Sequence, residues 1–124
     1  MRWLDAGLPP QRITVSSDAG GCLPVFDEEG RVRSMDVGAP GALVSTLAEL
    51  VARGRPLEQV LPAFTSNVAD LLRLTSKGRL HLGADADLVV LDERGAVHDV
   101  MARGRWHLRD RTAVVRGTFE GALA

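Results

Sequence analysis

The stretch Leu80-His81-Leu82-Gly83-Ala84-Asp85-Ala86-Asp87-Leu88-Val89-Val90-Leu91-Asp92 decides the fold of the second half of this chain. Its two apolar runs, 80–82 and 87–92, flank a Gly-Ala-Asp-Ala turn, and this pattern predicts two short strands. Turn sequences follow at Glu93-Arg94-Gly95 and Arg103-Gly104. Further strands are therefore expected over 97–102, 106–108 and 114–115.

The residues before this region have the spacing of helices. Leu43, Leu47, Leu50 and Val51 recur at helical intervals after Pro40-Gly41, and Gly54 ends this first helix. A second helix is expected from Pro56, with a kink at Pro62. Thr65-Ser66-Asn67 offers an N-cap for a third helix that ends before Gly78. Residues 2–7 are expected to form the last turn of a further helix, closed by Gly7.

The segment Ile13-Thr14-Val15-Ser16-Ser17-Asp18-Ala19-Gly20-Gly21-Cys22 carries the main candidate for chemistry. Its β-branched run predicts a short buried strand over 12–16 that delivers the Asp18 carboxylate to a glycine-rich loop. In α/β barrels, functional residues lie where strands end and the following loops begin. Val25 to Val32 then predicts a turn around Asp-Glu-Glu-Gly with short flanking strands.

Composition limits the class of protein. The 124 residues carry 15 basic and 16 acidic side chains, and the net charge of −1 gives no electrostatic case for binding nucleic acid or an anionic membrane. No run approaches the roughly 18 apolar residues that a membrane span needs, and the N-terminus has no signal-peptide pattern. The single cysteine, Cys22, excludes an intrachain disulfide and fits a cytoplasmic protein.

The motif from Lys77 to Asp92, with the Val-rich strand and Arg103-Gly104 after it, resembles the C-terminal signature of the amidohydrolase superfamily. Ser16 to Gly21, Pro24 to Gly30 and the tail Arg116-Gly117-Thr118-Phe119-Glu120 narrow the resemblance to the isoaspartyl (β-aspartyl) dipeptidase family. The resemblance implies an α/β plus β fold. Residues 1–76 would form the C-terminal remnant of a TIM-like barrel, with its last strand and helices, and residues 77–124 part of a small β-sandwich.

The resemblance also implies a chemistry. Family members hydrolyse β-linked peptide bonds of isoaspartyl dipeptides at a site with two zinc ions, which activate a bridging hydroxide. Asp18 matches the family's aspartate at the end of the eighth strand, which ligates one metal and shuttles a proton to the leaving amine. Gly20, Gly21 and Cys22 match the loop that contacts the substrate. The family has a serine where this chain has Cys22, and a thiol is a weaker hydrogen-bond donor than a hydroxyl.

Most of the family's metal ligands are missing from this sequence. There is no His-x-His pair, and the three histidines, His81, His98 and His107, all fall in the expected sandwich. Lys77 lies at the domain junction rather than at the end of a barrel strand. The chain alone is therefore not expected to bind both zinc ions or to be active. It would need an N-terminal barrel half.

Simpler structural roles remain open for the same residues. Asp18 before a glycine-rich loop could cap a turn. Cys22 could be a small buried apolar residue. Asp85 and Asp87 have the spacing of a pair of metal ligands, but they lie in a turn that enters a strand, which indicates a structural role. The three histidines suit packing or surface positions.

Three functional hypotheses follow from the sequence. The first is a C-terminal fragment of a zinc-dependent isoaspartyl-dipeptidase-like enzyme, and the second is a non-catalytic association module. The third keeps the superfamily with another substrate, as in a D-aminoacylase-like or dihydroorotase-like parent. A partial barrel leaves a strand edge and helix faces uncovered, so a homo-oligomer is expected.

Overall fold

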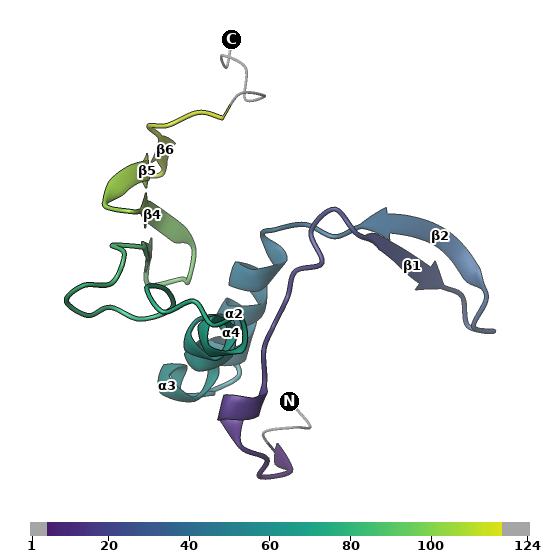
Figure 1. Cartoon of the computed structure of the whole chain (residues 1–124). Helices are drawn as coiled ribbons and strands as arrows, with labels where there is room; N and C mark the ends of the chain where they lie inside the picture. The colour runs from purple at the N-terminus through teal and green to yellow at the C-terminus, as the bar shows by residue number, and fades with distance from the viewer. Residues whose placement is uncertain (1–4, 118–124) are drawn as a thin grey trace.

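The computed structural model describes residues 5–117, which form a hairpin, a group of helices and a four-stranded sheet (Figure 1). Two expectations lie wholly or partly outside these residues. They are the helical turn over 2–7, of which residues 2–4 are not described, and the tail residues Thr118, Phe119 and Glu120. Gly7 has a φ of +68°, which suits the residue that follows a helix. Within 5–117, no helix has the length and apolar content to cross a membrane.

The hairpin pairs β1 (Cys22–Phe26) with β2 (Val32–Val37) in antiparallel fashion. The Asp27 carboxylate closes its turn, because Oδ1 accepts the backbone N–H groups of Glu29 at 3.1 Å and Arg31 at 2.8 Å. The short strands expected on both sides of this turn are confirmed. The hairpin projects away from the helices as an arm (Figure 1).

The helices expected between residues 40 and 78 are present with small differences, and residues 10–12 add a short 3-10 helix that the sequence does not predict. The chain forms η1 (Pro10–Arg12), α2 (Ala42–Ala52), α3 (Leu57–Val60), η2 (Leu61–Phe64) and α4 (Ser66–Leu71). Pro62 lacks an N–H for an α-helical bond, and the chain changes there from α-helix to 3-10 helix. The expected side-chain N-cap of α4 is wrong, since Thr65 makes no capping hydrogen bond and Asn67 lies inside the helix.

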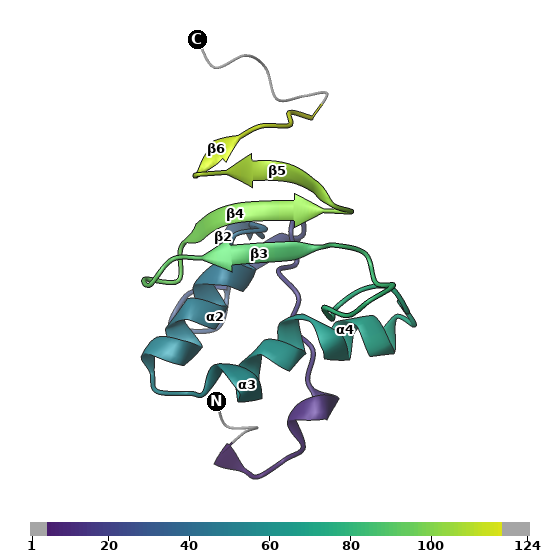
Figure 2. The ribbon, with the colours of Figure 1, turned by 90° about the vertical axis from the view of Figure 1, so that its left-hand side faces the viewer.

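The second half forms one antiparallel sheet in the order β3-β4-β5-β6. Its strands are β3 (Leu88–Leu91), β4 (Val97–Ala102), β5 (Arg105–Arg109) and β6 (Thr112–Ala113). Figure 2 shows them stacked beyond the helices, with β3 nearest α2. The turn between β3 and β4 touches α2, where a Cβ on Gly95 would lie 3.0 Å from the Cβ of Ala48.

Three expected strands differ from the structure. Residues 80–82 form no strand, and Leu82 is fully exposed in a loop that has no neighbouring strand within 5–117. The last strand is Thr112–Ala113 rather than 114–115, because the turn at Asp110 and Arg111 sets its register with β5. Residues 12–16 are not a strand, since a ladder needs a paired neighbour and the described residues supply none there.

The core is small. Buried apolar residues within 5–117 are Leu47, Val60, Ala63 and Ala69, all on the helices, and Asn67 is buried among them. The chain exposes 9676 Å², about half as much again as a compact monomer of this mass would expose. Within the described residues the four-stranded sheet has no second sheet against it, and this, with so small a core, fits part of a domain rather than a complete barrel and sandwich.

Candidate functional site

The segment before Asp18 is held in an extended conformation by the helices. Its anchor is Asn67 on α4, which is only 7% exposed. The Asn67 side-chain amide donates hydrogen bonds to the carbonyl oxygens of Pro10 and Ile13, both at 2.8 Å. Further along, the Val15 N–H donates to the carbonyl of Ala63 at 3.0 Å. These bonds take the place of the strand ladder that the sequence predicts and lead the chain to Asp18.

Asp18 lies in a tight turn at the end of this segment. Its φ is +49°, a left-handed conformation that aspartate tolerates better than most residues. Its N–H donates to the Ser16 hydroxyl at 3.3 Å, and its carbonyl accepts the Gly21 N–H at 2.9 Å. Asp18 is exposed. The turn geometry expected of an aspartate before glycines is therefore present, and it leaves the carboxylate free to meet a ligand.

Two glycines make room for Asp18, Gly21 beside its side chain and Gly38 beside its backbone. A Cβ on Gly21 would lie 2.6 Å from Oδ1 of the Asp18 carboxylate, closer than real contacts allow. A Cβ on Gly38 would lie 2.0 Å from the Asp18 carbonyl oxygen. The Gly20 N–H donates to the Gly38 carbonyl at 2.9 Å, and the Gly38 N–H donates to the Gly21 carbonyl at 3.0 Å. The structure thus brings Asp18, Gly20 and Gly21 together with Gly38, which the sequence does not single out.

Cys22 begins β1, opposite Val37 of β2, and its side chain is exposed. The expectation of a small buried apolar residue is therefore wrong. The reason is that β1 and β2 form an isolated two-stranded ribbon, which has no layer packed over either face within 5–117. The thiol stands three residues beyond Ala19, at the edge of the Asp18 loop.

The described residues do not make a dinuclear zinc site by themselves. Within 5–117, the one group of three side chains that could meet around a single ion is His98, Asp99 and Asp110, and it does not include Asp18. Asp99 is already engaged, because it accepts the Asp110 N–H at 2.7 Å and contacts His98 Nδ1 at 2.9 Å. The His98 contact first, and then the Asp110 N–H, lower the pKa of Asp99. This group therefore caps the turn between β5 and β6.

Asp85 and Asp87 are tied to a cation in the structure. Lys77 Nζ lies 2.8 Å from Oδ2 of Asp85 and also contacts Oδ2 of Asp87. Hydrogen bonding to Lys77 is the largest cause that lowers the pKa of each carboxyl, and the same bonds raise the pKa of Lys77. Asp87 Oδ1 also accepts the Arg103 N–H at 2.6 Å. These contacts support the structural interpretation of the pair, because they join the end of the helical region to the sheet.

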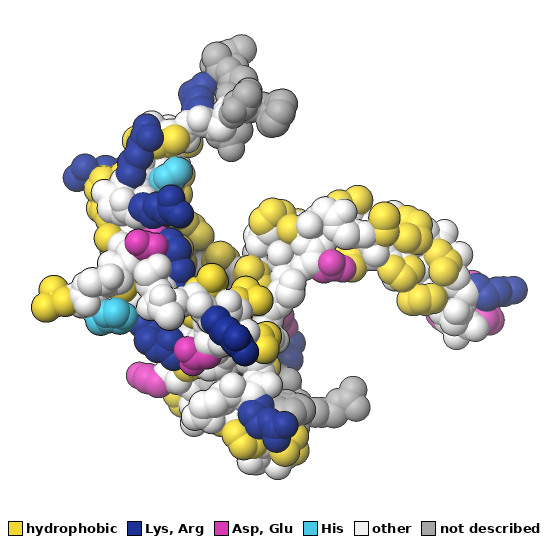
Figure 3. All heavy atoms as spheres, viewed as in Figure 1, with side chains coloured by type: hydrophobic (Ala, Val, Ile, Leu, Met, Phe, Trp, Pro, Cys, Tyr) yellow, Lys and Arg dark blue, Asp and Glu magenta, His cyan; other side chains and the backbone are white. Residues whose placement is uncertain are grey.

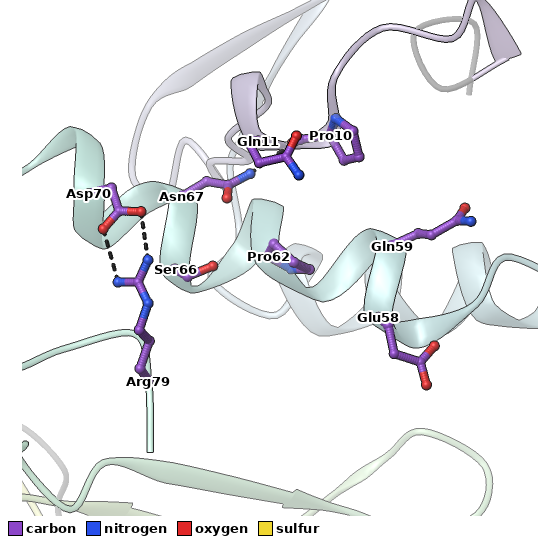
Figure 4. Close-up of a pocket in the computed structure, with 9 residues that line it drawn as sticks. All are labelled: Pro10, Gln11, Glu58, Gln59, Pro62, Ser66, Asn67, Asp70 and Arg79. Atoms are coloured by element: carbon purple, nitrogen blue, oxygen red, sulfur yellow. Dashed lines mark hydrogen bonds and ion pairs between the residues drawn. The ribbon is translucent and has the colours of Figure 1, made fainter. Parts of the chain in front are cut away.

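A shallow hollow of ≈ 430 Å³ lies beside α3, η2 and α4 and does not include the Asp18 loop (Figure 4). Its charged pair is Arg79 and Asp70, joined by two hydrogen bonds of 2.9 and 2.6 Å. The pairing lowers the pKa of Asp70 and raises that of Arg79. The pair uses one edge of the Arg79 guanidinium and joins α4 to the loop that follows it.

Comparison with known proteins identifies relatives of this chain. The model of the amidohydrolase family matches residues 3–107. Among curated proteins, the N-acetylglucosamine-6-phosphate deacetylase of Lysinibacillus sphaericus is 32% identical over 93 residues, which are 71% of this chain and 24% of that protein.

Solved structures of similar shape include β-aspartyl dipeptidase. The enzyme of Fervidobacterium islandicum AW-1 in complex with β-Asp-Leu dipeptide has a TM-score of 0.81 and 30% identity, over 94% of this chain and 31% of that chain. A second structure of that enzyme has a TM-score of 0.75 and 25% identity, with 94% and 28% covered. The N-acetylglucosamine-6-phosphate deacetylase of Pasteurella multocida, at 15% identity and a TM-score of 0.64, shares the fold. The chain spans less than a third of the length of each of these relatives.

Proposed function

The chain belongs to the amidohydrolase family, and from this premise we propose that it forms the C-terminal portion of a β-aspartyl-dipeptidase-like hydrolase. The observation that carries the proposal is the position of Asp18 at the end of an extended segment, with its carboxylate against Gly21 and its backbone carbonyl against Gly38. Two structures of β-aspartyl dipeptidase, one with β-Asp-Leu bound, match 94% of the chain. We assign residues 1–76 to the barrel portion and 77–124 to the second, β-rich portion.

In this proposal Asp18 is one ligand of a metal site and the group that accepts and returns a proton. A positioned carboxylate suits both tasks, since it binds metal through oxygen and can take up one proton. The family's two zinc ions would need further ligands from an N-terminal barrel half. We therefore expect the 124-residue chain alone to hold fewer zinc ions than a complemented protein and to leave isoaspartyl dipeptides intact. Gly20, Gly21 and Cys22 would border the substrate.

Complementation tests this function directly. The chain is mixed with the N-terminal barrel portion of a related β-aspartyl dipeptidase and Zn²⁺, and hydrolysis of β-Asp-Leu is measured. We expect activity in the mixture and in neither part alone. Asp18→Asn should lower kcat by about 10²- to 10⁴-fold, the usual contribution of a positioned acid–base group. Glu28→Gln, an exposed carboxyl in the hairpin turn, is the control and should leave kcat unchanged.

Two results would refute this assignment. The first is a mixture that assembles and binds zinc but does not cleave β-Asp-Leu. The second is an active mixture in which Asp18→Asn is as fast as Glu28→Gln. The first result, if no other amide substrate is cleaved, would favour the non-catalytic association module, and the second would show that Asp18 is not the catalytic carboxylate.

A deacetylase-like parent is the second candidate, and the 32% identity to N-acetylglucosamine-6-phosphate deacetylase favours it. Both candidates hydrolyse a C–N bond and differ in the substrate. Release of acetate from N-acetylglucosamine-6-phosphate in the same mixtures, without cleavage of β-Asp-Leu, would select this alternative. Cys22 at the edge of the loop is a position where such a difference in substrate could arise.

We further propose that the chain associates with a second copy of itself. Support comes from the large exposed surface and from the apolar residues on the hairpin, and Figure 3 shows hydrophobic side chains covering much of the visible face of this arm. A two-stranded ribbon is marginally stable without a covering layer. A cytoplasmic location remains a prediction from the sequence.

A further inference from the structure

Gly38 lies where the hairpin returns to the helices, directly after β2, and it is buried. The three heavy atoms nearest to a Cβ at this position would all be backbone atoms: the Asp18 carbonyl oxygen at 2.0 Å, the Asp18 carbonyl carbon at 2.7 Å and the Ser17 carbonyl oxygen at 3.0 Å. None of these three nearest atoms belongs to a flexible side chain that could move aside. A methyl group here must therefore displace the backbone of Asp18 itself.

Hydrogen bonds tie the same residue to the rest of the Asp18 loop. The Gly38 carbonyl accepts the Gly20 N–H at 2.9 Å, and its own N–H donates to the Gly21 carbonyl at 3.0 Å. Ala19 and Gly38 also form an isolated parallel bridge. Gly38 thus contacts the loop before, at and after Ala19, and it is the point where the hairpin is joined to the segment that carries Asp18.

We propose that Gly38 is a positioning residue for the Asp18 carboxylate, an inference that rests on the proposed role of Asp18. The missing side chain lets the Asp18 backbone sit against β2. This contact fixes the left-handed conformation of Asp18 and so the direction of its carboxylate over Gly21. The φ of Gly38 is outside the left-handed range. Glycine is therefore required at this position because there is no space for a side chain, and not because of its backbone conformation.

The test compares Gly38→Ala with Gly41→Ala in the full 124-residue chain. Gly41 is three residues away, and a Cβ there meets nothing within 4 Å. Amide hydrogen exchange by NMR reports the hydrogen bond from Gly20, and the ¹³C shift of the Asp18 carboxyl reports its surroundings. We expect Gly38→Ala to speed Gly20 exchange by about tenfold and to move the Asp18 signal. Gly41→Ala should change neither.

A second variant separates the side chain from the backbone. The three atoms nearest to a Cβ on Gly21 all belong to the Asp18 side chain, so Gly21→Ala should move the Asp18 carboxyl signal and leave Gly20 exchange near the wild-type rate. Equal exchange and equal Asp18 shifts in Gly38→Ala and Gly41→Ala would overturn the proposal. Faster exchange throughout β3, β4 and β5 as well would indicate a general loss of stability and would also count against a positioning role.

The complementation assay gives an independent readout. With β-Asp-Leu as substrate, Gly38→Ala should lower kcat at nearly unchanged KM, and Gly41→Ala should match the wild type. Equal kcat for both variants in an active mixture would contradict the positioning role. Absence of activity in every mixture, including the wild type, would instead refute the proposed function, while the exchange measurements would still decide the role of Gly38 in holding the loop.

Discussion

The side-chain amide of Asn67 lies 2.8 Å from the carbonyl oxygen of Ile13, and this hydrogen bond joins helix α4 to the Asp18 segment across 54 positions of sequence. The same amide also reaches the carbonyl of Pro10. One buried residue therefore satisfies two backbone acceptors of a segment that has no strand partner. This arrangement makes Asn67 the main polar link between the helices and the candidate site.

Asn67→Ala should destabilise the chain, because it leaves the partly buried Ile13 carbonyl oxygen without its donor and leaves the Pro10 carbonyl with only the 3.3 Å bond from the Ile13 N–H. The expected loss in the free energy of unfolding is about 1 to 3 kcal/mol. Urea unfolding followed by circular dichroism measures it. Ser66→Ala is the matched control, since the neighbouring hydroxyl makes no hydrogen bond within 5–117 and alanine suits a helix. A loss no larger than that of the control would show that the Asn67 link contributes nothing to stability.

The cluster of Lys77, Asp85 and Asp87 predicts a dependence of stability on pH. Lys77 lowers the pKa of both carboxyls in the folded chain, below the value of about 3.9 expected when the chain is unfolded. Their contribution is therefore present above about pH 4 and is lost as the pH falls through the lowered folded values. The raised pKa of Lys77 gives the opposite pH dependence: its contribution to stability is present at neutral pH and is lost only in strong alkali, as the pH rises through the folded value.

Thermal unfolding of Lys77→Ala between about pH 7 and pH 3 checks this expectation. Without the lysine, the pKa values of the two carboxyl groups return towards their ordinary values. The variant should therefore have a lower melting temperature at neutral pH, and acidification should lower that temperature less than it does in the wild type. Arg33→Ala is the control, because Arg33 is exposed and makes no ion pair within 5–117. Parallel melting curves for wild type and Lys77→Ala across this range would contradict the assignment.

The sequence predicts those parts of the fold that depend on local chemistry. Helix α2 follows from the spacing of its leucines, and the turn at Arg103-Gly104 follows from its residue types. The strand expected over 12–16 fails for a reason outside the local pattern. A β-branched run forms a ladder only beside another strand, and within 5–117 its neighbours are Asn67 and Ala63 on the helices.

In the candidate site too, the sequence predicts the local features and not the contacts that folding creates. Asp18 and the glycines after it stand out in the sequence, because an aspartate followed by Gly-Gly is typical of a loop. Gly38 is one of 13 glycines and has no distinguishing neighbours. Its importance arises from the approach of the Asp18 backbone, which only the folded hairpin creates. From the sequence, Asn67 is predicted to belong to a helix cap. Its burial could not be predicted, because it depends on how η1 packs against α4.

The turn between β4 and β5 offers a stabilising substitution. Arg103 and Gly104 have φ values of 49° and 74°, both positive, as in the two-residue turns that favour Asn-Gly. The Arg103 N–H that binds Asp87 belongs to the backbone and survives substitution. Arg103→Asn should therefore raise the free energy of unfolding by about 0.5 to 1 kcal/mol. Arg103→Val, with a branched side chain in the same conformation, should lower it, and urea midpoints that move the other way would refute this account.

The hairpin arm presents one apolar face to solvent. Residues paired across the ribbon share a face, and three such pairs are apolar: Cys22 with Val37, Pro24 with Met35 and, after a register shift between Val25 and Phe26, Phe26 with Val32. Met35 is 59% exposed and Val37 63%. The opposite face carries Asp36 and Ser34 beside Leu23 and Val25. The first face is therefore the surface on which we expect a second copy of the chain to pack.

Light scattering after size-exclusion chromatography tests this expectation. The wild type should elute as a discrete oligomer, because the apolar side chains of the arm, such as Phe26 and Met35, are exposed in a single copy. Phe26→Thr with Met35→Thr should shift it towards monomer, since threonine keeps strand propensity and removes apolar area. Leu23→Thr with Val25→Thr, on the other face of the same ribbon, should leave the oligomer intact. A monomeric wild type, or equal dissociation of both double variants, would show that this face does not hold the copies together.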